Sequence, residues 1–235
     1  MTSVGIIQPN YLPWRGYFDF IHEVDVFVFL DDVQYTPRDW RSRNRVKMPD
    51  GSCRWITVPV LGGRDQLIRE VRIDTTQGWQ RKHLETLRHS YRKAPFFGEY
   101  FPRLEALLID GGFEHLCDLD VALTREIAGW LGIRTPFLLA SALATGGTKD
   151  DKLLAIVRAV GGDDYLSGPA AQDYIAPALW ADAGVRLRYK DYTGYPDYPQ
   201  IAPPFEPAVS ILDLLFMQGP ATPDFIWGAH RQRPS

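Results

Sequence analysis

In the N-terminal part of the chain, short apolar runs typical of strands alternate with apolar residues at helical spacing. Residues 4–7 form a short apolar run that stops at Gln8-Pro9, a pattern typical of a buried strand. Apolar residues at helical spacing follow over 14–22, and residues 25–30 are nearly all β-branched or aromatic. A strand, a helix and a strand in this close succession predict a βαβ unit and a parallel sheet.

The middle of the chain departs from this order. Residues 54–60 and 67–73 predict two strands at a sheet edge, separated by a turn at Gly62-Gly63. Helical periodicity then continues through three segments, which we expect to be helices at 76–93, 96–109 and 113–131. These segments predict a helical insertion over about 76–133.

Regular alternation resumes after the insertion. Three further strands are predicted, at 137–140, 165–166 and 185–189. Three helices are predicted with them, at 149–160, 170–183 and 208–217, and the Pro-rich tail from about 219 is expected to fray. No repeat or linker divides the chain, so we predict one α/β domain over 1–235. Its fold class is a doubly wound, mainly parallel sheet with a β excursion and a helical insertion in the middle.

Composition and charge argue against several classes of protein. A net charge of −3 is not that of a general nucleic-acid binder, and no run of 18 apolar residues marks a membrane helix. The start of the chain lacks the pattern of a signal peptide, so a cytoplasmic location is expected. The two cysteines, Cys53 and Cys117, have neither disulfide-framework nor zinc-ligand spacing, and we expect no metal site.

Basic residues are concentrated in two short segments. One lies within 38–47 and the other within 81–93. Both are consistent with ordinary solvated faces. They are also consistent with a local pocket for phosphate or carboxylate, which would make a small anionic molecule the ligand.

Polar side chains follow most of the predicted strands. In open parallel sheets, ligands bind outside the carboxyl ends of the strands, so these residues are candidates for one site. They are Gln8, Asn10, Tyr11, Asp31, Asp32, Gln34, Ser141, Ser167, Gly168, Asp191 and Tyr192. The pair Asp31-Asp32 could bind a cation, orient a base or hold a sugar hydroxyl, or could cap the next turn. Adjacent strand residues point in opposite directions, so we expect only one of the pair to face a ligand.

Two predicted helix starts could bind an anion. Lys82 and His83 lie near the beginning of one helix, and His83 is either a general base or a surface histidine. Lys149 ends a glycine-containing stretch before another helix, although the spacing is not that of a phosphate-binding P-loop. No GxSxG motif is present, so covalent catalysis is not expected. The tyrosines of the Pro-rich loop 189–198 either pack on the domain or stack on a base or sugar.

Long motifs occur in one order from residue 4 to about 219: IIQPNYLPWRGYFDFI, DVFVFLDDVQY, WRSRNRVK, WQRKHLETLRHSYRKAPFF, DDYLSGPAAQDYI, DYTGYPDYPQ and EPAVSILDLLFMQG. Together they resemble the WbqC-like protein family of bacteria. One departure concerns residues 149–153, where Lys-Asp-Asp-Lys-Leu stands in place of the family's Lys-Thr-x-Arg-Leu. The added negative charge could alter anion binding there.

The resemblance implies work on activated amino sugars in glycan or secondary-metabolite pathways. The implied reaction is acyl or aminoacyl transfer to a sugar amine from a thioester, carried by coenzyme A or an acyl carrier protein. In the leading hypothesis, Asp31 or Asp32 orients sugar hydroxyls, His83 takes the proton of the amine, and the backbone at Ser167-Gly168 stabilises the oxyanion. The diphosphate would lie on Arg43, Arg45 and Lys82. The remaining binding candidates are Gln8, Tyr11, Trp14, Gln34, Asn44, Lys149, Asp191 and Tyr198.

Two alternatives stay open. A nucleotidyltransferase is suggested by the first strand–turn–helix unit, although Pro13-Trp14-Arg15-Gly16 stands where that enzyme class has histidines. A non-catalytic binding module is suggested by the aromatic loop around Tyr195 and by the lack of a decisive nucleophile.

Overall fold

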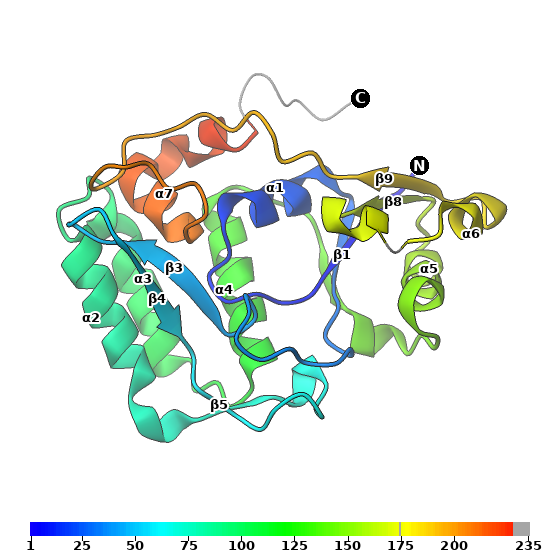
Figure 1. Ribbon diagram of the computed structural model, residues 1–235, viewed down its shortest axis with the longest axis horizontal. Helices are drawn as coiled ribbons and strands as arrows, with labels where there is room; N and C mark the ends of the chain where they lie inside the picture. The colour runs from blue at the N-terminus through cyan, green and yellow to red at the C-terminus, as the bar shows by residue number, and fades with distance from the viewer. Residues whose placement is uncertain (174, 228–235) are drawn as a thin grey trace.

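A five-stranded parallel sheet forms the centre of the computed structural model, which describes residues 1–173 and 175–227 (Figure 1). The strands run in the order β7-β2-β1-β8-β9, and each neighbouring pair is parallel. Their bounds are β1 Ser3–Ile7, β2 Val26–Phe29, β7 Phe137–Leu139, β8 Asp164–Ser167 and β9 Arg186–Tyr189. The predicted α/β fold with a mainly parallel sheet is thus confirmed.

Helices cover both faces of the sheet. The chain places α1 (Arg15–Glu23) and α4 (Leu116–Trp130) against one face, and α5 (Lys149–Ala159) and α6 (Pro177–Asp182) against the other. Alternation along β2 explains the division, because Phe27 and Phe29 enter the larger core whereas Val28 enters the smaller one. The sheet is therefore doubly wound, as its hydrophobic pattern predicts.

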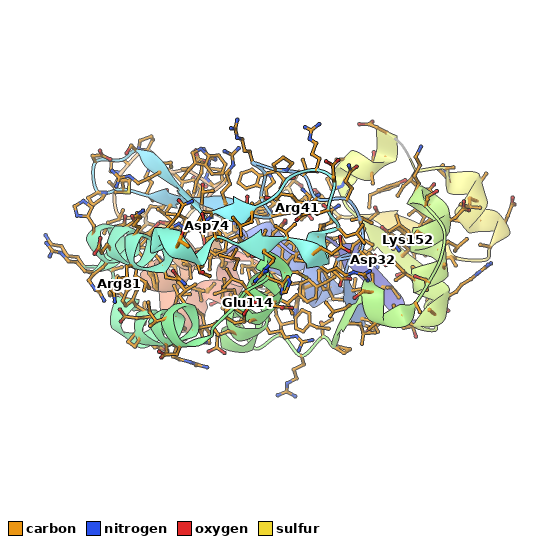
Figure 2. All side chains as sticks on the ribbon, turned by 90° about the horizontal axis from the view of Figure 1, so that it is seen from below. Asp32, Arg41, Asp74, Arg81, Glu114 and Lys152 are labelled. Carbon is orange, nitrogen blue, oxygen red and sulfur yellow. The ribbon has the colours of Figure 1, made fainter. Side chains whose placement is uncertain are left out.

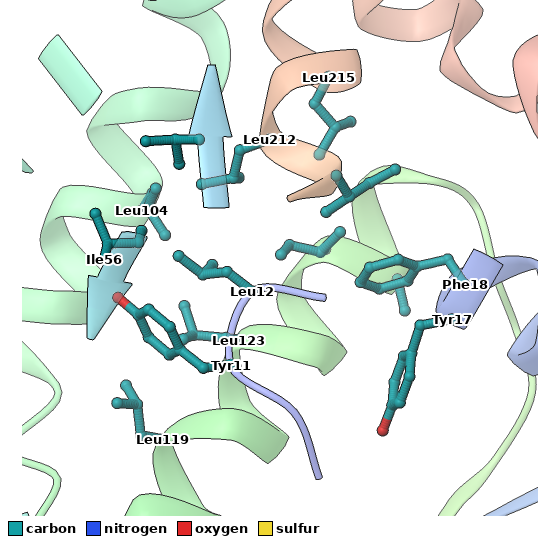
Figure 3. Close-up of a cluster of buried hydrophobic side chains, with 14 of the residues drawn as sticks. Tyr11, Leu12, Tyr17, Phe18, Ile56, Leu104, Leu119, Leu123, Leu212 and Leu215 are labelled. Carbon is teal, nitrogen blue, oxygen red and sulfur yellow. The ribbon is translucent and has the colours of Figure 1, made fainter. Parts of the chain in front are cut away.

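The insertion between β2 and β7 builds a second layer of structure beside the sheet. It contains an antiparallel hairpin, two short strands and three helices, and α7 (Ile211–Gln218) packs with them (Figure 1). The elements before α4 are β3 Arg43–Lys47, β4 Cys53–Thr57, β5 Val60–Leu61, β6 Arg72–Ile73, α2 Trp79–Tyr91 and α3 Phe97–Asp110. Figure 3 shows their shared core, in which Tyr11 and Leu12 from the β1–α1 loop lie between α4, the hairpin and α7.

Four sequence predictions need correction. The strand β3 was not predicted, because three of its five residues are charged. Residues 67–73 form a 3-10 turn and the two-residue β6 instead of one strand. The helix predicted over 170–183 is interrupted, because Pro177 cannot donate a backbone hydrogen bond and starts α6 instead. The tail folds into a packed 3-10 turn over Gly219–Phe225, and residues 228–235 lie outside the described structure.

The described residues contain neither a membrane-spanning helix nor a cluster of metal-binding side chains. No helix within 1–173 and 175–227 is long and apolar enough to cross a membrane. In the same part of the chain, no group of three or more His, Cys, Asp or Glu side chains is placed to hold a metal ion.

Candidate functional site

The strand order reverses direction at the centre of the sheet. From β1 the chain moves outward to β2 and then β7, and it returns to add β8 and β9 on the opposite side of β1. Open α/β sheets bind ligands in the crevice outside the carboxyl ends of the two strands at such a reversal. Gln8 and Tyr11 follow β1, and Ser167 and Gly168 end β8, so the topology places them at this position.

A buried carboxyl group from α4 is the most unusual feature near the end of β1. Asp120 is 0% exposed, and neither of its oxygens has a hydrogen-bond partner within the described residues. Burial raises the pKa of Asp120 well above its ordinary value, and the charge of Arg41 only partly opposes this. Buried polar groups in folded proteins nearly always have partners, so an isolated acid of this kind indicates a functional site.

The charge of this carboxyl group acts on three buried phenols. Burial, together with the charge of Asp120, raises the pKa values of Tyr11, Tyr17 and Tyr35. The Tyr17 hydroxyl also donates a hydrogen bond to the backbone oxygen of Gln8, 3.1 Å away. The end of β1 is thereby connected to the surroundings of Asp120.

The end of β2 reaches the same region through Cys117. Burial, followed by the charges of Asp31 and Asp120, raises the pKa of the Cys117 thiol. Cys117 lies three residues before Asp120 on α4, so the two side chains share one face of that helix. The carboxyl groups of Asp31 and Asp120 thus act on one small volume.

A hydrogen-bonded chain supports Tyr11. Its hydroxyl lies 2.9 Å from Nδ1 of His83, and Nε2 of His83 lies 3.1 Å from the backbone oxygen of Thr57. A carbonyl oxygen can only accept, so Nε2 carries the proton and Nδ1 accepts from Tyr11. His83 is 5% exposed, and burial lowers its pKa to about 4. This geometry favours a neutral His83 that positions Tyr11, while the general-base role stays a prediction.

The loop that carries Tyr11 is held by backbone contacts. The amide of Asn44 donates to the backbone oxygens of Tyr11 (3.2 Å) and Leu12 (2.8 Å), and the Tyr11 backbone N–H donates to the oxygen of Trp40 (2.9 Å). Leu12 has a φ of 43°, a conformation that a leucine adopts only when its surroundings enforce it. Asn44 therefore fixes the shape of the β1–α1 loop, a role different from the predicted contact with substrate.

The two carboxylates after β2 have different partners. Asp31 is almost fully buried and accepts hydrogen bonds from the backbone N–H and the hydroxyl of Ser141, at 2.9 and 2.5 Å. Asp32 forms an ion pair of 2.7 Å with Lys152 on α5, and its second oxygen has no hydrogen-bond partner within the described chain. Figure 2 shows Asp32 and Lys152 side by side, with Arg41 nearer the middle of the molecule. Asp31 thus caps the turn after β7, and Asp32 keeps one free oxygen.

The predicted diphosphate residues do not gather at one point. Arg43 stands over the ring of Trp55 at 4.3 Å, whereas Arg45 donates to the backbone oxygen of Ala208 and pairs with Glu206. Lys82 is exposed on α2, and within the described residues no contact joins it to either arginine. A single cradle made of all three remains a prediction without a supporting contact.

The other predicted residues also have definite positions. Gln34 is exposed and donates to the backbone oxygen of Arg64, and Asp191 accepts from Thr193 at the surface. Lys149 is exposed at the start of α5 with a φ of 50°. Ser167 is buried and Gly168 half-buried, and the oxyanion role of their backbone stays a prediction.

The aromatic loop packs back on the protein. The Tyr198 hydroxyl donates to Asp213 at 2.9 Å, and the rings of Tyr192 and Tyr195 contact Trp14 with centroids 5.2 and 6.0 Å apart. These contacts favour packing over the alternative in which the loop stacks on a ligand. They also place Trp14 beneath the loop.

Sequence reasoning missed Asp120 and Tyr35, and it noted Arg41 only as one of the basic residues within 38–47. Tyr35 and Arg41 lie inside the motifs DVQY and WRSRNRVK, so they were present in segments already noted. Asp120 falls on the apolar stripe of α4 formed by Leu116, Leu123 and Ile127. A charged residue on the buried stripe of a helix is the sequence signal that could have identified it.

Comparisons with known proteins agree with the motifs. The profile of the WbqC-like protein family matches residues 8–225. A protein of Mycobacterium tuberculosis (strain ATCC 25618 / H37Rv), named uncharacterized protein Rv1507c, is 41% identical over 228 residues, which cover 96% of this chain and 98% of that protein. No solved structure matches. The chain belongs to the WbqC-like protein family.

Proposed function

We propose that this protein is a transferase that moves an acyl or aminoacyl group onto the amine of a nucleotide-linked amino sugar. The acceptor amine would bind beside Asp120, at the carboxyl end of β1. Family membership supports work in glycan or secondary-metabolite biosynthesis. The observation that carries the proposal is the buried carboxyl group of Asp120, which has no partner of its own among the described residues.

A carboxyl group with a raised pKa suits an amine acceptor. Its conjugate base is stronger than an exposed aspartate, and an ammonium or amine donates the hydrogen bonds that Asp120 lacks. Hydroxyl groups of a sugar could be bound by Tyr17, Tyr35 and the free oxygen of Asp32. Arg41 forms an ion pair with Asp39, and the rest of its guanidinium would bind an anionic part of the substrate.

The reaction balances with Asp120 as proton carrier. The neutral amine attacks the carbonyl carbon of a thioester, and a C–N bond forms while a proton of the amine passes to the Asp120 carboxylate. The C–S bond then breaks, and the leaving thiolate receives that proton as it becomes a thiol. The products are an amide and a free thiol, so no oxidant or reductant is required.

Neighbouring groups would position the acceptor and stabilise the oxyanion during this reaction. Tyr11, held by His83, would fix the β1–α1 loop against the acceptor. The backbone N–H groups near Ser167-Gly168 would bind the developing oxyanion. The donor would be a thioester of coenzyme A or of an acyl carrier protein, and the enzyme would work in the cytoplasm.

Turnover with a matrix of substrates tests the proposal. Nucleotide-linked amino sugars are combined with acyl and aminoacyl thioesters, and products are detected by mass spectrometry. Asp120→Asn should lower kcat/KM by about 100- to 10,000-fold, the usual contribution of a general base. Asp118→Asn is the matched control, because Asp118 lies on the same helix but is exposed. Equal turnover by the wild-type and Asp120→Asn proteins would remove Asp120 from the mechanism.

A further inference from the structure

Two exposed tryptophans lie against each other on the hairpin side of the molecule. Trp40 is 47% exposed and Trp55 is 43% exposed, and their ring centroids are 5.4 Å apart with planes inclined by 40°. Trp55 lies on β4, and Trp40 lies in the loop that precedes β3. Large aromatic side chains gathered at a surface are typical of binding sites, where they supply contact area at low entropic cost.

An arginine completes this surface. The Arg43 guanidinium stands 4.3 Å from the centre of the Trp55 ring. Its Nε atom is buried without a hydrogen-bond partner, and within the described chain no carboxylate pairs with it. The neighbouring Arg45 is already held by Ala208 and Glu206, so Arg43 is the cation that remains available.

This surface adjoins the candidate site. Trp40 immediately precedes Arg41, whose charge acts on Asp120. The backbone oxygen of Trp40 accepts from the N–H of Tyr11, the residue whose pKa Asp120 also raises. One loop therefore carries the exposed Trp40 and Arg41, which pairs with Asp39 and whose charge acts on Asp120.

We propose that Trp40, Trp55 and Arg43 form a binding site for a nucleoside diphosphate. The base would stack on the indole rings, and the diphosphate would lie on Arg43, on the side that leads to Arg41. Stacking on aromatic rings tolerates any base, and a guanidinium matches two phosphate oxygens at once. The inference rests on the proposed function, because it assigns the nucleotide part of the same substrate.

Binding of free nucleoside diphosphates tests the assignment. The probes are UDP, dTDP, CDP, GDP and ADP, and affinity is measured by calorimetry on the full chain. Trp40→Ala should weaken binding of the preferred diphosphate by about 5- to 150-fold, the range for loss of one stacked base. Trp40→Phe should retain most of the affinity, and Arg43→Gln should weaken diphosphate binding more than binding of the nucleoside alone.

Two controls separate this site from the catalytic proposal. Arg81 is exposed on α2 at one end of the molecule, whereas Arg41 lies near the middle (Figure 2), so Arg81→Ala should leave the affinity unchanged. Asp118→Asn, the control used for turnover, should also leave free-diphosphate binding unchanged, because Asp118 is exposed on α4 and belongs to neither proposed site. Equal affinity in the wild-type and Trp40→Ala proteins, or no binding of any diphosphate, would overturn the inference. Neither result bears on the proposed role of Asp120, which is tested separately by turnover.

Discussion

Tyr11 and His83, which are 72 residues apart in sequence, meet through a contact of 2.9 Å between the tyrosine hydroxyl and Nδ1 of the histidine. The contact joins the end of the first sheet strand to α2 of the insertion. Burial keeps the imidazole neutral, and because Nε2 faces the carbonyl oxygen of Thr57, Nε2 carries the proton and Nδ1 accepts from Tyr11. The insertion thus shapes the loop at the candidate site through a buried polar contact.

The neutral state of His83 makes stability depend on pH. Burial lowers its pKa to about 4, below the unfolded value of 6.5, so the unfolded chain binds more protons between these two values. The stability that neutral His83 contributes is therefore fully present above about pH 6.5. It is lost as the pH falls toward 4, by up to about 3 kcal/mol. The free energy of unfolding, measured by urea titration at several pH values between 4 and 7, should change less with pH in His83→Gln than in the wild type. The exposed His89→Gln is the control, and an unchanged pH dependence in His83→Gln would contradict the assignment.

Asp120 should affect stability with the opposite sign. Its folded pKa is raised, so the folded protein keeps the proton longer than the unfolded chain does, and stability falls as the pH rises above the unfolded pKa. Asp120→Asn removes this cost. It should raise Tm at pH 7 to 8, and each 1 kcal/mol gained corresponds to about 2–4 °C in a chain of this size. A gain in stability with a loss of turnover would identify a residue kept for function.

The pair of Asp32 and Lys152 should be coupled energetically. Both side chains are largely buried and 2.7 Å apart, so removing either leaves the other charge poorly solvated. A double-mutant cycle with Asp32→Asn and Lys152→Met should give a coupling energy of about 0.5–3 kcal/mol in urea unfolding. The exposed pair Arg72–Glu114 (3.1 Å) serves as comparison and should couple more weakly. Additive effects at Asp32 and Lys152 would mean that the pair does not hold α5 to the end of β2.

Much of the fold could be predicted because its strands are buried on both faces. The apolar runs before Gln8 and Asp31 are long enough to stand out, and turn residues separate them from the helices. The strand β3 could not be identified in the same way, because three of its five residues are charged even though none of the five is exposed. Its partner β4 was found through its β-branched and aromatic residues.

The candidate site was less predictable than the sheet. The sequence located the strand ends and the motif residues Tyr11 and His83, but periodicity cannot show which side chains from distant segments meet. Asp120 belongs to the site only because its charge reaches Tyr11 and Tyr17, which are about 100 residues away in sequence, and that is a tertiary relationship. Asn44 was predicted to bind substrate, yet its amide is used by the backbone of the Tyr11 loop.

The protonation of Asp120 tests the central claim most directly. Carboxyl carbons of aspartate are labelled with carbon-13, and the Asp120 resonance is identified by its absence in Asp120→Asn. We expect this resonance to titrate well above the ordinary aspartate range and to shift when a nucleotide-linked amino sugar is added. A resonance that titrates in the ordinary range and does not respond to any amino sugar would rule out Asp120 as the group that binds the amine.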